Sequence, residues 1–318
     1  MGFINSTPPT WITTSSVKFY SGLQYGETNI TNLDIIVPTD AQSATPLIIN
    51  IHGGSFIFGD KADIYDTNTE QNNINAYLAE GIAYASINYT LINQFYEKSG
   101  IKRCFDSSVL AIQFLKYYED LFNIDKNKVA INGGSAGGGI GLWIGLSNDL
   151  ADLSSLNLIK REDTRVNFLA LNIAQATYDL VKWESDVFAD AYPSYSLELD
   201  YNTNGGTRDS INRTYGIESY NELFIEPTLS LRSELDMIRL MDGNIEIPPT
   251  YLYYDNILYP DVISNTIIDS VHSDYMGKTI MDEMESNTAT PLTFLGTLGV
   301  DNTGDESKEE WLIRKLKE

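Results

Sequence analysis

A single serine stands in a glycine-rich turn directly after an apolar run. Residues 129–132 are Val-Ala-Ile-Asn, and they lead into Gly133, Gly134, Ser135, Ala136 and Gly137, which form the pattern G-x-S-x-G. When a strand reverses into a helix within a few residues, the residue at the turn is strained, and small neighbours let strand and helix approach. The apolar, helix-like run 140–146 follows. The pattern therefore predicts that Ser135 is presented as a nucleophile at the tip of a sheet.

A second glycine-rich segment follows an earlier buried-strand pattern at residues 46–51, and from residue 52 it reads His-Gly-Gly-Ser-Phe. Acyl transfer builds negative charge on a carbonyl oxygen, and each backbone N–H group aimed at that oxygen typically contributes about 2.7–4 kcal/mol. Glycine lets the backbone come close to a substrate because no side chain intervenes. We expect the amides of Gly53, Gly54 and Ala136 to form an oxyanion hole, and His52 to brace the loop rather than to transfer protons.

These two motifs together resemble the hormone-sensitive-lipase-like carboxylesterase and lipase branch of the α/β-hydrolases. The likeness is specific from about residue 45 to residue 180, although Gly134 and Ser55 depart from the Asp and the Gly or Ala that are usual there. It implies an α/β fold with a mainly parallel central sheet, helices on both faces and an inserted cap. It also implies a serine carboxylic-ester hydrolase that forms an acyl-enzyme on Ser135, with short-chain acyl esters as the default substrates.

The catalytic base is the irregular part of the predicted site. A serine hydroxyl needs a base, and the base needs an orienting carboxylate. The chain has two histidines, and with His52 in the oxyanion loop the candidate base is His272. The branch that the chain resembles has its histidine after the last strand, here 291–295, but no histidine follows that segment. We favour a base supplied by the neighbouring loop; the alternative is a catalytically impaired binding protein of the same fold.

Three aspartates are candidates for the catalytic acid. Asp255 ends the predicted strand 250–255, where the resemblance places this carboxylate, and it is the first choice. Asp269 lies only three residues before His272, which is an awkward separation for orienting the same ring. Asp179 follows the predicted strand 166–174, from which some α/β-hydrolases take their acid.

Composition limits the partners and cofactors. The 44 acidic and 21 basic residues give a net charge of −23, so nucleic acid and anionic membrane surfaces are unfavourable partners. The sequence contains no run of eighteen apolar residues, so we expect no membrane span.

A lone Cys104 and a start without signal-peptide features lead us to expect a cytoplasmic protein. With two histidines and one cysteine we expect no metal and no cofactor. The expected partner is a small-molecule ester, and a homodimer is compatible with the sequence.

Strand and helix patterns alternate along most of the chain, which predicts a parallel sheet covered on both faces. Residues 17–180 and 247–318 are expected to form the core. Residues 181–246 are rich in Tyr, Asn, Asp and Ser, interrupt the alternation, and predict a cap that residues 1–16 could join. Expected strands are 17–20, 33–37, 47–51, 82–88, 129–132, 166–174, 250–255 and 291–295; expected helices are 70–80, 105–122, 140–146 and 273–285. Aromatic residues that could line a pocket in the cap are Trp183, Phe188, Tyr192, Tyr195, Tyr215 and Phe224.

Overall fold

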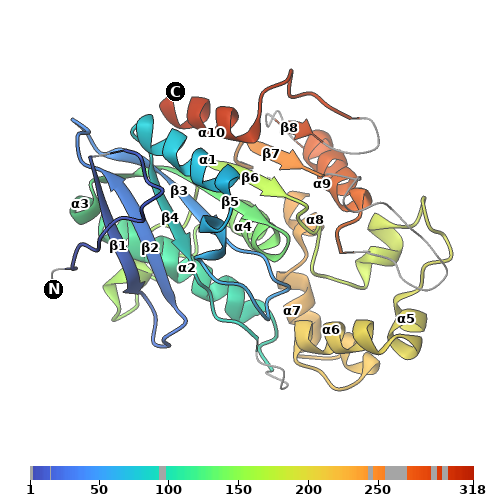
Figure 1. Cartoon of the computed structure of the whole chain (residues 1–318). Coiled ribbons are helices and arrows are strands. Elements are labelled where there is room, and N and C mark those ends of the chain that lie inside the picture. The colour runs from blue at the N-terminus through green and yellow to red at the C-terminus, as the bar shows by residue number, and fades with distance from the viewer. Residues whose placement is uncertain are drawn as a thin grey trace.

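One sheet runs through the molecule (Figure 1). The computed structural model describes residues 3–14, 16–92, 98–242, 246–254, 271–287, 292–295 and 300–318. Within these residues the sheet has eight strands in the order β1-β2-β4-β3-β5-β6-β7-β8. The pairs β1–β2 and β2–β4 are antiparallel and the other five pairs are parallel, which confirms the mainly parallel sheet. The strands are β1 (Val17–Gln24), β2 (Asn32–Pro38), β3 (Thr45–Ile51), β4 (Ala83–Ile87), β5 (Ile124–Gly134), β6 (Phe168–Asn172), β7 (Thr250–Tyr253) and β8 (Leu292–Leu295).

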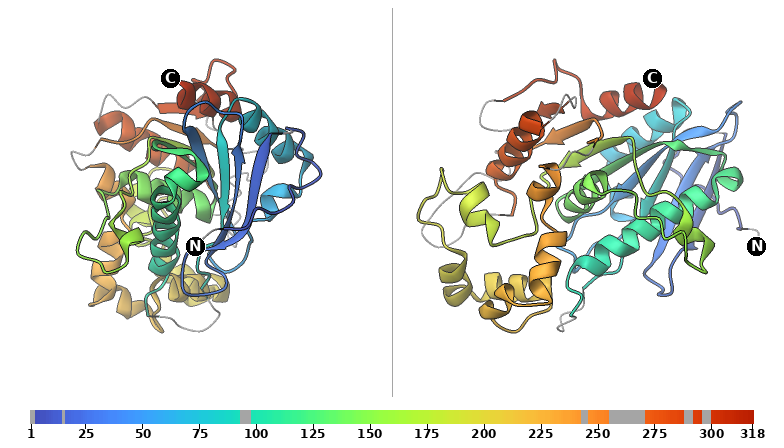
Figure 2. Two further views of the ribbon diagram at one scale, coloured as in Figure 1. Left: turned by 90° about the vertical axis from the view of Figure 1, so that its left-hand side faces the viewer. Right: turned by 180° about the vertical axis from the view of Figure 1, so that it is seen from behind.

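Helices cover both faces of the sheet (Figure 2). Alternate strand residues point to opposite faces, so Ile48 of β3 packs with α1 and α10, while Leu47 and Ile49 pack with α2 and α4. No helix among the described residues is long and apolar enough to cross a membrane. The α-helices are α1 (Asn68–Ala79), α2 (Lys102–Tyr117), α3 (Glu119–Phe122), α4 (Ala136–Leu146), α5 (Leu197–Thr203), α6 (Gly205–Tyr215), α7 (Thr228–Glu234), α8 (Met237–Met241), α9 (Asp274–Asn287) and α10 (Lys308–Lys317). Short 3-10 helices are η1 (Asp63–Tyr65), η2 (Leu158–Arg161) and η4 (Tyr220–Phe224), and η3 (Trp183–Val187) is a π-helix.

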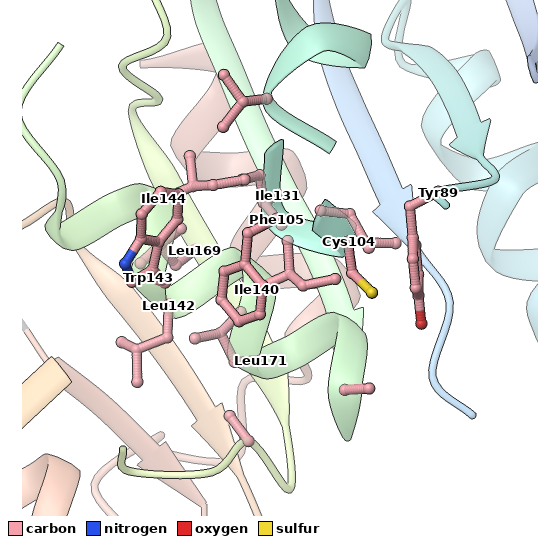
Figure 3. Packing of buried hydrophobic residues seen from close by; sticks show 14 of the residues in the cluster. Tyr89, Cys104, Phe105, Ile131, Ile140, Leu142, Trp143, Ile144, Leu169 and Leu171 are labelled. Atoms are coloured by element: carbon pink, nitrogen blue, oxygen red, sulfur yellow. The ribbon is translucent and has the colours of Figure 1, made fainter. Parts of the chain in front are cut away.

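Helix α4 packs directly on β5 and β6 because several of its residues are glycine. A Cβ added at Gly141 would lie 2.8 Å from Ile131 Cγ2, and one at Gly145 would lie 2.5 Å from Leu169 Cδ1. Figure 3 shows the larger side chains of α4, such as Trp143, directed among the residues of α2, β5 and β6. The run 136–146 is therefore buried throughout, as its composition suggests.

Several element boundaries in the structure differ from those that the sequence patterns predict. The helix expected at 105–122 is two helices, since α2 ends at Tyr117 and α3 follows. Asn123, with φ of 52°, ends α3 in the left-handed conformation that often closes a helix. Strand β5 then begins at Ile124, five residues earlier than expected, because Ile124 pairs with Thr45 of β3. The C-terminal helix α10, which a capping box at Ser307 opens, was not expected at all.

The described N-terminal residues contact α1, α2 and α3, and the suggestion that residues 1–16 join the cap stays a prediction. The Phe3 ring contacts Phe114 and Phe122 beside α2 and α3. The Thr13 amide donates to the side chain of Asn75 on α1. Residues 181–242 form η3, η4 and α5–α8, and Figure 1 shows α5 and α6 projecting from the body of the molecule.

A close backbone contact between α4 and the end of β3 predicts a costly substitution at Gly137. A Cβ there would lie 2.0 Å from the Ile51 carbonyl oxygen and 2.6 Å from that of His52, both backbone atoms that cannot rotate away. We expect Gly137→Ala to lower the free energy of unfolding by about 3 kcal/mol, measured by denaturant titration. Gly205→Ala is the control, because its Cβ would meet only the end of the Arg208 side chain at 3.5 Å. A loss below about 1 kcal/mol for Gly137→Ala would contradict the argument.

Candidate active site

Ser135 occupies the turn between β5 and α4 in a strained conformation. Its φ is 51° and its ψ is −121°, and a positive φ at a residue other than glycine costs about 1–3 kcal/mol. Two hydrogen bonds hold the turn, because the Ser135 amide donates to the Asn172 carbonyl and the Gly139 amide donates to the Ser135 carbonyl, both at 2.9 Å. The neighbouring strand β6 and the first turn of α4 therefore maintain the strain.

His272 lies in the connection from β7 to α9, two residues before α9 begins. Its Nε2 atom is 2.9 Å from the Ser135 Oγ, which is hydrogen-bond distance. A serine hydroxyl that donates to an imidazole in this way has the arrangement that base-activated nucleophiles require. The structure thus brings together the two residues that the sequence suggested as nucleophile and base, although 136 residues separate them in the chain.

Gln175 is a residue of this site that the motifs gave no reason to select. Its side chain is buried, and its Nε2 donates to the carbonyl of Val271, next to His272, at 2.8 Å. Its Oε1 accepts a hydrogen bond of 2.6 Å from the Tyr178 hydroxyl. The loop after β6 therefore holds the histidine segment in place. A glutamine outside any motif carries no sequence signal for such a role.

The structure gives a different role to one candidate acid and leaves two untested. Asp255 and Asp269 lie outside the described residues and stay predictions. Both carboxylate oxygens of Asp179 are engaged by Arg232 of α7, at 2.8 Å from Nε and 3.3 Å from Nη2. Arg232 also donates to the Leu223 carbonyl at 2.7 Å. This buried ion pair ties the loop after β6 to the cap, so the carboxylate of Asp179 is committed to a structural contact.

The loop expected to form the oxyanion hole passes directly beside the nucleophile. A Cβ added at Gly53 would lie 3.5 Å from the Ser135 Cβ and 3.0 Å from the Gly134 carbonyl oxygen, so a side chain would crowd the site. Gly54 has φ of 107°, and a Cβ there would meet backbone atoms at 2.0 Å. Across the described residues, the amides of Gly53, Gly54 and Ala136 donate to no protein acceptor. These N–H groups are therefore available to a bound ligand.

His52 supports this loop from behind. Its ring stacks on Tyr89 with centroids 4.3 Å apart, and its Nδ1 is 2.7 Å from the Gly53 carbonyl oxygen. Because a carbonyl only accepts, Nδ1 carries the proton. Nε2 is buried without a hydrogen-bond partner in the described part of the chain, and burial lowers the pKa of the ring. A neutral His52 packed in this way suits a bracing role.

A cavity of about 330 Å³ opens at Ser135 between the core and the cap. Of the six cap aromatics considered from the sequence, Trp183 and Tyr195 line it, whereas the buried Phe188 packs against both of them. One face of α6 contributes a further part of the wall. The lining residues are Ser55, Phe56, Ile92, Ile101, Ser135, Ala136, Gln175, Tyr178, Leu180, Trp183, Tyr195, Leu197, Asn204, Gly206, Thr207, Ser210, Ile211, Arg213, Thr214 and Val271.

The strand order and the elbow at Ser135 place this chain among the α/β-hydrolases. Within that class the chain belongs to the BD-FAE family, whose model matches residues 33–197, about half of its length. A search of curated proteins finds no significant match. The α/β-hydrolase prediction is confirmed, and the assignment to the hormone-sensitive-lipase-like branch stays a prediction.

Several solved esterases share the fold. A truncated carbohydrate esterase from gut microbiota superimposes with a TM-score of 0.63 at 14% identity, covering 98% of this chain and 100% of that one. Esterase B from Lactobacillus rhamnosis (HN001) gives 0.58 at 16% identity, with 89% and 75% covered. A thermophilic esterase from the Planctomycetes species Thermogutta terrifontis gives 0.58 at 14% identity, with 98% and 91% covered.

The buried, neutral His52 predicts a pH-dependent part of the stability. Its pKa is lowered in the folded state, so below the ordinary histidine value of about 6.5 the unfolded chain binds a proton that the folded chain does not. This stabilisation is full above about pH 6.5 and is lost as the pH falls toward the lowered folded-state pKa. We expect the wild type to lose more free energy of unfolding between about pH 7.5 and about pH 5.5 than His52→Asn loses. Urea titrations at both pH values measure this, and equal losses would refute it.

Proposed function

We propose that the chain is a serine carboxylic-ester hydrolase, and that the contact of 2.9 Å between Ser135 Oγ and His272 Nε2 is its working pair. Ser135 attacks the ester carbonyl while His272 takes the hydroxyl proton. The protonated histidine gives this proton to the departing alcohol, which leaves an acyl group on Ser135. Water then attacks the acyl-enzyme with His272 again as the base, and the carboxylic acid and the free serine are released.

In this proposal the amides of Gly53, Gly54 and Ala136 stabilise the negative charge on the carbonyl oxygen. Support comes from the glycine backbone that passes beside Ser135 and from the three amides that donate to no protein acceptor among the described residues. Ala136 is the first residue of α4, so the positive end of that helix dipole adds to the same stabilisation. We assign the orientation of His272 to Asp255, which follows β7 in the chain.

The size of the cavity favours small substrates. A volume of about 330 Å³ is at the lower end of small-molecule pockets, which suits a short acyl chain. The wall formed by α6 and its start includes Asn204, Thr207 and Ser210, so a polar alcohol such as a sugar fits this side. One structural neighbour is a carbohydrate esterase, which points the same way.

The alternative, a binding protein without catalysis, predicts no base at the serine. The histidine within hydrogen-bond distance of Ser135 favours the enzyme.

We also propose a cytoplasmic location, which rests on Cys104. This lone cysteine is buried, and burial raises the pKa of its thiol to about 12, as suits a packing residue rather than a redox group.

The working pair is tested by kinetics with 4-nitrophenyl acetate. We expect Ser135→Ala and His272→Ala each to lower kcat by at least about a thousandfold, because each removes one half of a unit that acts together. Ser154→Ala, at an exposed serine that does not line the cavity, is the matched control and should keep the wild-type rate. Full activity in His272→Ala would show that His272 is not the base. A wild type no faster than Ser135→Ala would favour the binding protein.

The acid assignment predicts opposite behaviour for two aspartates. Asp255→Asn should lower kcat by about 10³- to 10⁴-fold with little change in stability, as loss of the orienting carboxylate does in serine hydrolases. Asp179→Asn should lower the free energy of unfolding by about 3 kcal/mol, because it leaves the Arg232 charge buried without its counter-ion. Thermal unfolding and kcat are measured on both variants. If Asp179→Asn loses activity while Asp255→Asn keeps it, the assignment is wrong.

A further inference from the structure

The cavity at Ser135 has one charged side chain in its wall among the described residues, and that residue is Arg213. It lies in the last turn of α6, on the helix face that also brings Ser210 and Thr214 to the cavity. The other residues of the wall are apolar or carry neutral hydroxyl and amide groups. Arg213 is therefore the feature that distinguishes this pocket electrostatically.

Arg213 is half-buried, yet in the described part of the chain it makes no hydrogen bond and no ion pair. This is unusual for a chain with 44 acidic and 21 basic residues, where carboxylates are plentiful. Other arginines are engaged: Arg232 pairs with Asp179, and Arg314 pairs with Glu306. Five guanidinium donors that face a cavity without a protein acceptor suit an anionic ligand, because the planar group matches a carboxylate with two parallel hydrogen bonds.

From these observations we infer that the substrate is an ester that carries a carboxylate, and that Arg213 binds this group while Ser135 attacks the ester bond. This inference rests on the proposed function and adds the substrate class to it. With a net charge of −23 the molecule as a whole repels anions, so a substrate of this class needs a local cation. The carboxylate lies on the acyl part or on the alcohol part of the ester, and the two are distinguished by experiment.

An arginine in the last turn of a helix also interacts favourably with the helix dipole. That effect stabilises α6 whatever the substrate is, and it does not depend on the side chain reaching the cavity. A measurement that compares charged with neutral substrates on the same enzyme preparation separates the two roles, because a change in stability or in the active fraction cancels from the ratio.

The test uses two matched pairs of esters. Monoethyl succinate and ethyl butyrate differ in a carboxylate on the acyl part, and 4-acetoxybenzoate and phenyl acetate differ in a carboxylate on the alcohol part. For one of these pairs we expect Arg213→Gln to lower the charged-to-neutral ratio of kcat/KM by about tenfold to a hundredfold. Arg213→Lys should retain part of the ratio, and added salt should lower it in the wild type. Arg208→Gln, at an exposed arginine of the same helix, is the control and should leave the ratio unchanged.

The outcomes separate the inference from the proposed function. If the wild type hydrolyses the neutral esters through Ser135 but Arg213→Gln leaves both ratios unchanged, the inference is overturned and the proposed function stands. If Arg208→Gln lowers the ratio as much as Arg213→Gln does, a general charge effect replaces binding by Arg213, and the inference is also overturned. If the wild type hydrolyses none of the four esters, both fail.

Discussion

The close approach of α4 to the end of β3 determines where the parts of the site lie. The Cα of Gly137 sits so near the carbonyl groups of Ile51 and His52 that no side chain fits. His52 opens the loop that carries Gly53, and Gly137 lies two residues after Ser135. One backbone contact thus sets the distance between the nucleophile and the loop beside it. The positive φ of Ser135 is a consequence, because β5 must turn into α4 at once to make this contact.

The loop after β6 holds helices α6 and α7 of the cap through side-chain contacts. Asp179 pairs with Arg232 of α7, and the Tyr215 hydroxyl of α6 donates to the Tyr178 carbonyl at 2.6 Å. The loop that anchors the cap also carries Gln175, which holds the histidine segment. A single connection therefore contacts both the segment of His272 and the helix α6 that lines the cavity.

The sequence predicts those parts of the site whose conformation depends on residues adjacent in the chain. The elbow at Ser135 and the glycine loop could be identified because both need small residues at fixed spacing next to a strand. The early start of β5 depends on pairing of Ile124 with Thr45, which the sequence around Asn123 does not reveal. Gln175 contacts Val271 and Arg213 lines the cavity at Ser135, both distant in the chain, so no local pattern predicts their importance. The two remaining candidate acids, Asp255 and Asp269, lie outside the described residues.

The position of His272 in the chain is compatible with the proposed role of a general base. A general base has to reach the serine hydroxyl with a fixed geometry, and its place in the order of strands is irrelevant to that requirement. Strands β7 and β8 are parallel neighbours, paired from Thr250 with Leu292 to Tyr253 with Leu295, so their following loops begin at the same edge of the sheet. In the sheet order β7 lies one strand nearer to β5 than β8 does. Gln175, in the loop after the intervening strand β6, bonds to Val271 next to His272. A histidine after β7 can therefore reach Ser135 as well as one after β8.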